Sequence, residues 1–320
     1  MELIKLNAFQ VLELIIKNEI TSLEYVEQLL NHIEKREPYV GAWTYLDKDL
    51  IIRSAIKADK ERKIGSKDSF LGLPIGIKDI IDTFDMPTEN GSKICIGRKP
   101  SQDAKLVKLL RNAGFIIFGK TVTTEFALSA PGKTKNPNDL NCTPGGSSSG
   151  SAAAVSDHMI PLSIGSQTGG SVLRPASFNG IIGFKPTFGT ISRTGMSPVS
   201  YRLDHPGIYA RCIEDIELVS SIILSYDEND YDMIKGYSFH KQSDSNLKDM
   251  KFAFIKGPAW KYGDNDMKNG FENLIKSINL KIDEIQLPKI FEKAINSHIT
   301  IMNGGILSSL KKHYKSNKSK

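Results

Sequence analysis

The sequence predicts an α/β fold in which a central β-sheet is covered on both faces by α-helices. From residue 73 onward, apolar runs of strand length alternate with amphipathic stretches of helix length, which is the pattern of such a sheet. The chain has 320 residues, of which 40% are hydrophobic and 24% charged. This composition is ordinary for a globular protein, and the length allows a large core.

The first 65 residues predict helices that cover the sheet. Thr21 and Glu24 have the spacing of a capping box, in which two side chains satisfy the first backbone N–H groups of a helix. Apolar residues recur at helical spacing after Thr21. We expect further helices at 8–17 and at 50–63.

The alternation that follows gives the sheet and its helices. Strands are expected at 73–77, 115–118, 160–164, 181–184 and 251–255. Helices are expected at 104–112, 151–158, 213–224 and 266–278. The polar stretch 227–247 predicts a loop or a surface insertion.

No repeat or clear linker divides the chain, so we expect one domain over 1–303. It consists of a helical cover (1–65), a core (66–225) and a C-terminal part (226–303), followed by a lysine-rich tail (304–320). Five lysines at 311–320 supply most of the net charge of +6. A solvated, frayed terminus explains them better than contact with RNA.

Several function classes are excluded by what the sequence lacks. No apolar run approaches the ~20 residues of a membrane span, and the N-terminus does not resemble a secretory signal. Cys95, Cys142 and Cys212 show neither metal-ligand nor disulfide spacing, so a reduced cytoplasm is expected. Neither a metal nor an organic cofactor is implied. Residues 114–121 match the sequence pattern of a phosphate-binding loop, but their apolar interior predicts a strand instead.

Three sites carry the chemistry: the glycine–serine clusters at 144–151 and 165–171, and Lys78 between apolar runs. Glycines let backbone N–H groups turn toward a bound oxygen. A serine is a nucleophile once a base activates it, and a lysine is such a base when its pKa is lowered. The combination indicates acyl transfer. The alternatives are flexible loops and a structural lysine paired with Asp79 or Asp82.

The runs PGGSSSGSAAAV and GSQTGGSVLRPASFNGIIGFKPT resemble the amidase signature family of Ser-Ser-Lys hydrolases. The resemblance continues through LGLPIGIKDIIDT, GFIIFGKTVTTEFAL and RLDHPGIYARCIEDIELV. That family includes bacterial amidases, fatty-acid amide hydrolases and the A subunit of the aminoacyl-tRNA amidotransferase. The resemblance implies a mixed central sheet and hydrolysis of a carboxamide bond.

The resemblance also implies a role for each residue of the three sites. Ser171 would form the acyl-enzyme, Ser147, after a cis peptide bond, would relay the proton, and Lys78 would be the general base. The backbone oxyanion hole would be formed by Thr168, Gly169, Gly170 and Ser171.

Other residues compete with these assignments. Ser148 and Ser149 rival Ser147 on spacing, and His205 would be the histidine of a Ser/His/Asp arrangement that the sequence does not otherwise indicate. Gln167 and Arg174 depart from the pattern of the tRNA branch and favour the general amidase branch.

The resemblance further implies that relatives continue past the end of this chain, so we expect a C-terminally shortened fold with an incomplete acyl pocket. Residues 292–303 would form a helix bordering the substrate cleft. Three functions follow: an amidase acting on a small carboxamide, an A-type amidotransferase subunit, or an inactive relative serving as an interaction module. A homodimer or amidotransferase subunits are the protein partners considered; no membrane or nucleic-acid partner is expected.

Overall fold

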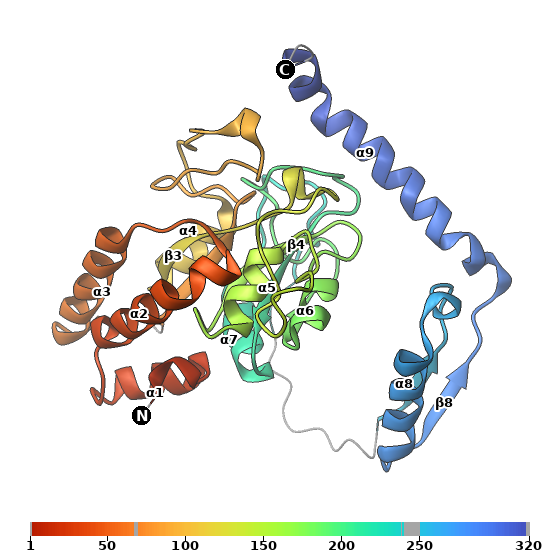
Figure 1. The fold of residues 1–320 in the computed structure, drawn as a ribbon, viewed down its shortest axis with the longest axis horizontal. Helices are drawn as coiled ribbons and strands as arrows, with labels where there is room; N and C mark the ends of the chain where they lie inside the picture. The colour runs from red at the N-terminus through yellow and green to blue at the C-terminus, as the bar shows by residue number, and fades with distance from the viewer. Residues whose placement is uncertain (1, 67–69, 238, 240–249, 318–320) are drawn as a thin grey trace.

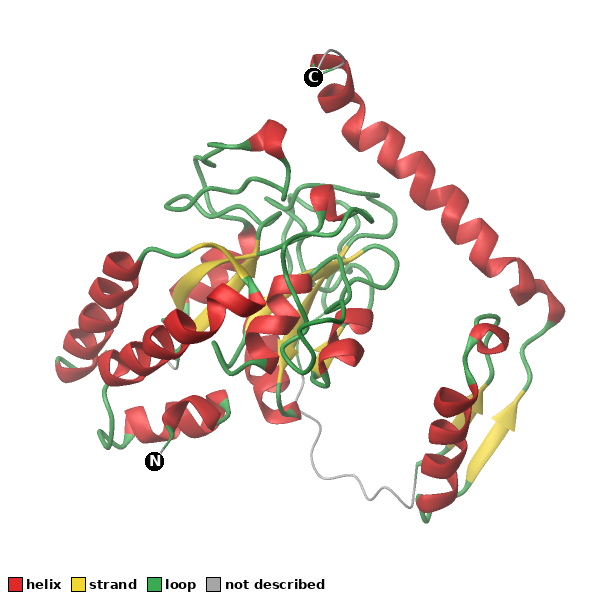
Figure 2. Cartoon of the chain, viewed as in Figure 1, coloured by secondary structure: helices red, strands yellow, loops and turns green. Residues whose placement is uncertain are grey.

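The computed structural model describes residues 2–66, 70–237, 239 and 250–317 (Figure 2). The helices are α1 (Ala8–Ile16), α2 (Ser22–Val40), α3 (Lys48–Lys63), α4 (Lys105–Asn112), α5 (Ser149–Ser156), α6 (Leu173–Asn179), α7 (Ile213–Ile223), α8 (Asn265–Ser277) and α9 (Ala294–Ser316). The strands are β1 (Trp43–Tyr45), β2 (Pro74–Lys78), β3 (Ile116–Thr121), β4 (Ser163–Gln167), β5 (Ile182–Phe184), β6 (His205–Ala210), β7 (Phe252–Ile255) and β8 (Ile282–Ile285).

A mixed six-stranded sheet with the order β1-β3-β2-β4-β6-β5 forms the centre of the fold. β2 pairs in parallel with β3 and β4, and the remaining pairs are antiparallel. The chain moves to one side of β2 through α4 and to the other side through α5. Right-handed crossovers therefore place these two helices on opposite faces. The prediction of a mixed sheet covered on both faces is confirmed (Figure 1).

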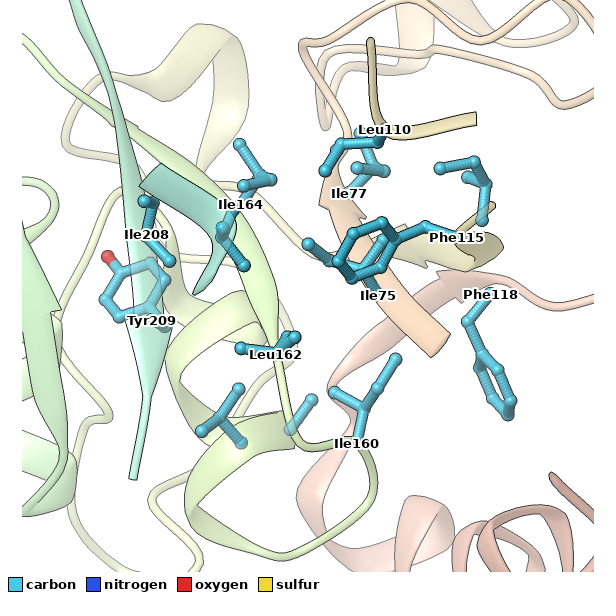
Figure 3. Packing of buried hydrophobic residues seen from close by; sticks show 14 of the residues in the cluster. Ile75, Ile77, Leu110, Phe115, Phe118, Ile160, Leu162, Ile164, Ile208 and Tyr209 are labelled. Atoms are coloured by element: carbon cyan, nitrogen blue, oxygen red, sulfur yellow. The ribbon is translucent and has the colours of Figure 1, made fainter. Parts of the chain in front are cut away.

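The core of the protein lies between this sheet and its helices. Every residue of β2 is buried, as an apolar strand inside a parallel pair should be. Figure 3 shows Ile75 and Ile77 of β2 near Leu110 and Phe115, and Ile164 of β4 near Ile208 of β6. The strands that end at the candidate site are thus fixed by close packing on both faces.

The N-terminal helices form the predicted cover. The capping box is confirmed, since Glu24 N donates to Thr21 Oγ1 at 3.1 Å and Thr21 N donates to Glu24 Oε2 at 2.7 Å. Asp215 at the start of α7 accepts hydrogen bonds from the backbone of Ala8 and Phe9, both at 2.9 Å. The cover is therefore tied to the sheet layer by a contact across more than 200 residues.

Several elements differ from the sequence-based expectation. β4 lies three residues further along the chain than predicted, so that its end reaches Gln167. β1, α6, β6 and β8 are unpredicted. β6 contains Pro206, a residue that normally argues against a strand inside a sheet.

In Figure 1, α8 and β8 of the C-terminal segment, 250–317, lie at the right, and α9 runs from there to the C-terminus at the top. β7 and β8 pair in parallel, and α8 packs beside them through the ring of Phe271, which contacts Phe254 and Trp260. α9 extends to Ser316, so the frayed tail expected at the C-terminus is wrong for the residues up to there. The helix also continues across the domain boundary predicted at residue 303.

Neither a membrane-spanning helix nor a metal-binding cluster is found among the described residues. No helix among them is long and apolar enough to cross a membrane. No group of three or more histidine, cysteine or acidic side chains among them could hold a metal ion.

Candidate active site

Lys78 and the two glycine–serine clusters meet at one edge of the sheet. Lys78 is the last residue of β2, and Ser166 lies near the end of β4, the neighbouring parallel strand. The carboxyl ends of parallel strands lie at the same edge, so the loops that follow them converge. Ser147 joins them from the turn that precedes α5.

Lys78 is fully buried and contacts two serines. Its Nζ lies 2.7 Å from Ser147 Oγ and 2.8 Å from Ser166 Oγ. Among the described residues it forms no salt bridge with Asp79 or Asp82, the partners of the structural alternative. Burial lowers the pKa of Lys78 well below its ordinary value, and the negative charge of Asp204 opposes this shift only in part. A lysine with a lowered pKa is a competent base near neutral pH.

The structure distinguishes Ser147 from its two rivals. Ser148 Oγ bonds to the backbone of Ser166, and Ser149 Oγ donates to Val122 O, whereas Ser147 reaches Lys78. The peptide bond between Gly146 and Ser147 is cis, as the resemblance implies.

The second cluster contains three consecutive backbone N–H groups without a partner among the described residues. Gly169, Gly170 and Ser171 donate no backbone hydrogen bond to any acceptor in the described part of the chain. Gln167 Oε1 accepts instead from the backbone of Val172 and Leu173, at 2.9 and 3.1 Å. The three preceding N–H groups are therefore available to a negative oxygen.

Two side chains hold this loop from the protein side. Asp204 Oδ1 accepts from Thr168 Oγ1 at 2.6 Å, and its carboxylate also accepts from the backbone of Val199 and Ser200. Burial raises the pKa of Asp204, and these hydrogen bonds act in the opposite direction. Tyr209, fully buried on β6, donates to Ser171 O at 2.9 Å.

A cavity of about 890 Å³ opens beside Ser171, a size typical of small-molecule sites. Its wall combines the second cluster, the loop 127–129, and one side of α9. The lining residues are Ala127, Leu128, Ser129, Thr168, Gly169, Gly170, Ser171, Arg174, Val199, Pro258, Ala259, Ala294, Ile295, His298, Met302, Asn303 and Ile306. Arg174 is the one permanently charged side chain in this lining, and it also donates two hydrogen bonds to Gly146 O. A second cavity, of about 570 Å³ beside α2, contains none of the predicted site residues.

The predicted residues thus fall into two groups. Lys78 and Ser147 are in contact, whereas Thr168, Gly169, Gly170 and Ser171 line the cavity. No hydrogen bond joins the hydroxyls of Ser147 and Ser171 among the described residues. In ligand-free sites such contacts are often long, and they tighten when substrate binds.

Sequence reasoning missed two members of the site. Ser166 belongs to the predicted cluster 165–171 but was given no role, because its contact with Lys78 depends on the pairing of β2 with β4. His298 on α9 lines the cavity and donates to Thr168 O at 3.1 Å. His205, the alternative histidine, instead hydrogen-bonds Leu203 O and does not line the cavity.

Several known proteins resemble this chain in sequence. A family model described as Amidase matches residues 24–305. Over 322 aligned residues the chain is 34% identical to the A subunit of a glutamyl-tRNA(Gln) amidotransferase from Streptomyces coelicolor, covering 97% of this chain and 65% of the relative. A similar relative from Staphylococcus haemolyticus is covered over 59% of its length, so the chain spans less than two thirds of these relatives.

Solved structures show the same likeness. A peptide amidase from Stenotrophomonas maltophilia superimposes with a TM-score of 0.84 at 26% identity, covering 98% of this chain and 68% of that one. The A subunit of the glutamyl-tRNA(Gln) amidotransferase from Thermotoga maritima gives a TM-score of 0.82 at 30% identity, covering 96% and 66%.

Proposed function

Because the chain belongs to the amidase family, we propose that it hydrolyses the carbon–nitrogen bond of a carboxamide through an acyl-enzyme on Ser171. One observation carries the proposal above the others. The amine of Lys78 is buried at 2.7 Å from Ser147 Oγ, and Ser171 lines the cavity described above.

The proposed reaction begins with proton transfer. Neutral Lys78 takes a proton from Ser147, and Ser147 takes one from Ser171, whose oxygen then attacks the amide carbonyl. The relay runs in reverse to protonate the departing nitrogen. Water then attacks the acyl-enzyme and releases the acid.

The second cluster would stabilise the negative oxygen that forms in the attack. The N–H groups of Gly169, Gly170 and Ser171, which have no partner in the described part of the chain, support this role, and Thr168 anchors the loop that carries them. The loss of one such donor typically costs about 3 kcal/mol of barrier. The cavity is large enough for a small aliphatic or aromatic carboxamide.

Ammonia release from a panel of carboxamides tests the proposal. The panel includes neutral amides and amides that carry a carboxylate, because Arg174 is the charged side chain of the lining. We expect release by the wild type and its loss in Ser171→Ala. If Ser171→Ala releases ammonia at the wild-type rate, another residue is the nucleophile and the proposal is wrong. Absence of release from every amide, together with no labelling of Ser171 by a fluorophosphonate, would favour an inactive relative acting as an interaction module.

The A-type subunit of a tRNA-dependent amidotransferase is the second candidate function. The names of the curated relatives favour it, since those proteins are glutamyl-tRNA(Gln) amidotransferase A subunits. In that case glutamine would be the amide, and ammonia release would rise on addition of partner subunits and charged tRNA. Full release by the chain alone from a simple carboxamide favours the first candidate instead.

A further inference from the structure

α9 crosses the loops of the candidate site at very short range. A Cβ atom on Gly305 would lie 2.2 Å from Ser200 Oγ and 2.7 Å from Ser200 Cα, a separation that only glycine permits. One turn later, Ser309 Oγ donates to Val199 O at 2.9 Å. The helix is therefore seated on the backbone of residues 199–200, although none of its residues is buried.

This seating point is directly connected to the second glycine cluster. The backbone N–H groups of Val199 and Ser200 donate to the carboxylate of Asp204, which accepts the hydroxyl of Thr168. From the opposite side, His298 on α9 donates from Nε2 to Thr168 O at 3.1 Å. Thr168 is thus held by its side chain from one direction and by its carbonyl from the other.

Holding the carbonyl of Thr168 fixes the direction of the next N–H group. A trans peptide unit is planar, so Thr168 O and the N–H of Gly169 lie in one rigid plane and point in opposite directions within it. The two glycines that follow leave the backbone free to rotate unless something holds that plane. His298 supplies the contact, and its ring carbon Cε1 would lie 3.5 Å from a Cβ on Gly169.

We infer that His298 is a positioning residue for the oxyanion loop, and that α9 delivers it through the close crossing at Gly305. The inference rests on the proposed function, because it assigns the loop amides to the negative oxygen of the acyl-transfer reaction. His298 acts through Thr168, and Lys78, Ser147 and Ser171 retain their roles.

Four variants of the full chain test the inference. His298→Ala removes the donor, and His298→Gln keeps an N–H donor of similar reach. Gly305→Ala introduces the clash with Ser200, whereas Gly304→Ala is its matched control, because a Cβ on Gly304 meets nothing within 4 Å. Both glycine replacements favour the helix to the same degree, so their difference reports the seating of α9 alone.

The first measurement is the rate at which a fluorophosphonate labels Ser171. We expect a decrease of about tenfold to a hundredfold in His298→Ala and in Gly305→Ala, somewhat less than the loss of a whole oxyanion donor. His298→Gln should recover most of the rate, and Gly304→Ala should react as the wild type does. Wild-type rates in both His298→Ala and Gly305→Ala would overturn the inference while leaving the proposed function intact.

The second measurement is amide hydrogen exchange over residues 165–172, which does not require a reactive serine. Exchange there should be faster in His298→Ala and Gly305→Ala and unchanged in Gly304→Ala. If the wild type is not labelled, the proposed function fails and this measurement alone decides the positioning of the loop. Identical exchange in the wild type and His298→Ala would overturn the inference in that case.

Discussion

Two regions that contribute to the candidate site are held in place in opposite ways. At the sheet edge, Lys78 and Ser147 are 0% and 1% exposed and are held by strands packed on both faces. The C-terminal side of the cavity comes from α9, a helix without a buried residue that contacts the loops of the candidate site through His298 and Ser309. The first region contains the proposed chemistry, and the second shapes the space in front of it.

This difference predicts which of the two regions tolerates substitutions better. A buried residue at a strand end cannot move without disturbing the core, so its geometry is set by the whole sheet. An exposed helix can shift as a unit when one contact is lost. We therefore expect the largest effects at the sheet edge, and effects limited to a few contact residues on the C-terminal side.

The largest expected effect is the loss of the base. Lys78→Met should lower the labelling rate of Ser171 by about 10² to 10⁴-fold, the usual contribution of a positioned general base. Lys120→Met is the matched control, since Lys120 is also fully buried but bonds Ile81 O and Thr88 Oγ1 and neither of the two serines. If both variants fold and their labelling rates fall by the same factor, the loss comes from removing a buried lysine of the structure. Lys78 would then not be the base.

The next prediction concerns the free energy of unfolding, which should fall more for a substitution in the sheet than for one in the C-terminal segment. Phe118 is fully buried beside Trp43, and Phe118→Ala should lower the free energy of unfolding by about 3 to 5 kcal/mol. Phe271 on α8 is 46% exposed and touches Phe254 and Trp260, so Phe271→Ala should cost at most about 1.5 kcal/mol. Urea denaturation measures both. Similar losses would show that the C-terminal segment is as tightly packed as the sheet.

The sequence predicted the sheet edge well because its signals are local. Apolar runs predict buried strands, and glycine–serine clusters after them predict loops with available N–H groups. The resemblance to a known family added a role for each residue of these sites. Lys78 and Ser147 are in contact, and the roles of Lys78, Ser147, Ser171 and the oxyanion loop all remain predictions.

The C-terminal wall was predicted only in part: a helix bordering the cleft was expected at 292–303, and α9 lines the cavity there, but its course beyond residue 303 was not expected. Gly304 and Gly305 look like the end of a helix, but α9 continues through them because Gly305 lets it cross Ser200 at short range. That reason lies about 100 residues away in sequence. His298 was equally hidden, because no local pattern connects a histidine on an exposed helix with the carbonyl of Thr168.

The pH dependence of the labelling rate tests whether the pKa of the base is set by the sheet edge and is independent of α9. Only neutral Lys78 can accept a proton, so the labelling rate should rise about tenfold per pH unit below its pKa and then level off. Because burial lowers this pKa, the plateau should begin well below pH 10.5, where an ordinary lysine titrates. His298→Ala should lower the plateau without moving its midpoint, since the contacts of Lys78 come from the sheet edge. A midpoint near 10.5 in the wild type contradicts the assignment of Lys78 as the base.

The smallest effect is expected at Ser166, the residue of the sheet edge that the sequence did not reveal. A neutral amine has N–H donors and one lone pair, so donation from Lys78 to Ser166 Oγ turns the lone pair toward Ser147. Ser166→Ala should slow labelling by about threefold to tenfold, the value of one hydrogen bond. Ser166→Thr, which keeps the hydroxyl, should recover part of the rate. Ser163→Ala is the control, because Ser163 is a buried serine of the same strand whose hydroxyl bonds Ser151 O instead. A rate in Ser166→Ala no lower than that in Ser163→Ala would remove Ser166 from the site and leave the orientation of Lys78 to Ser147 alone.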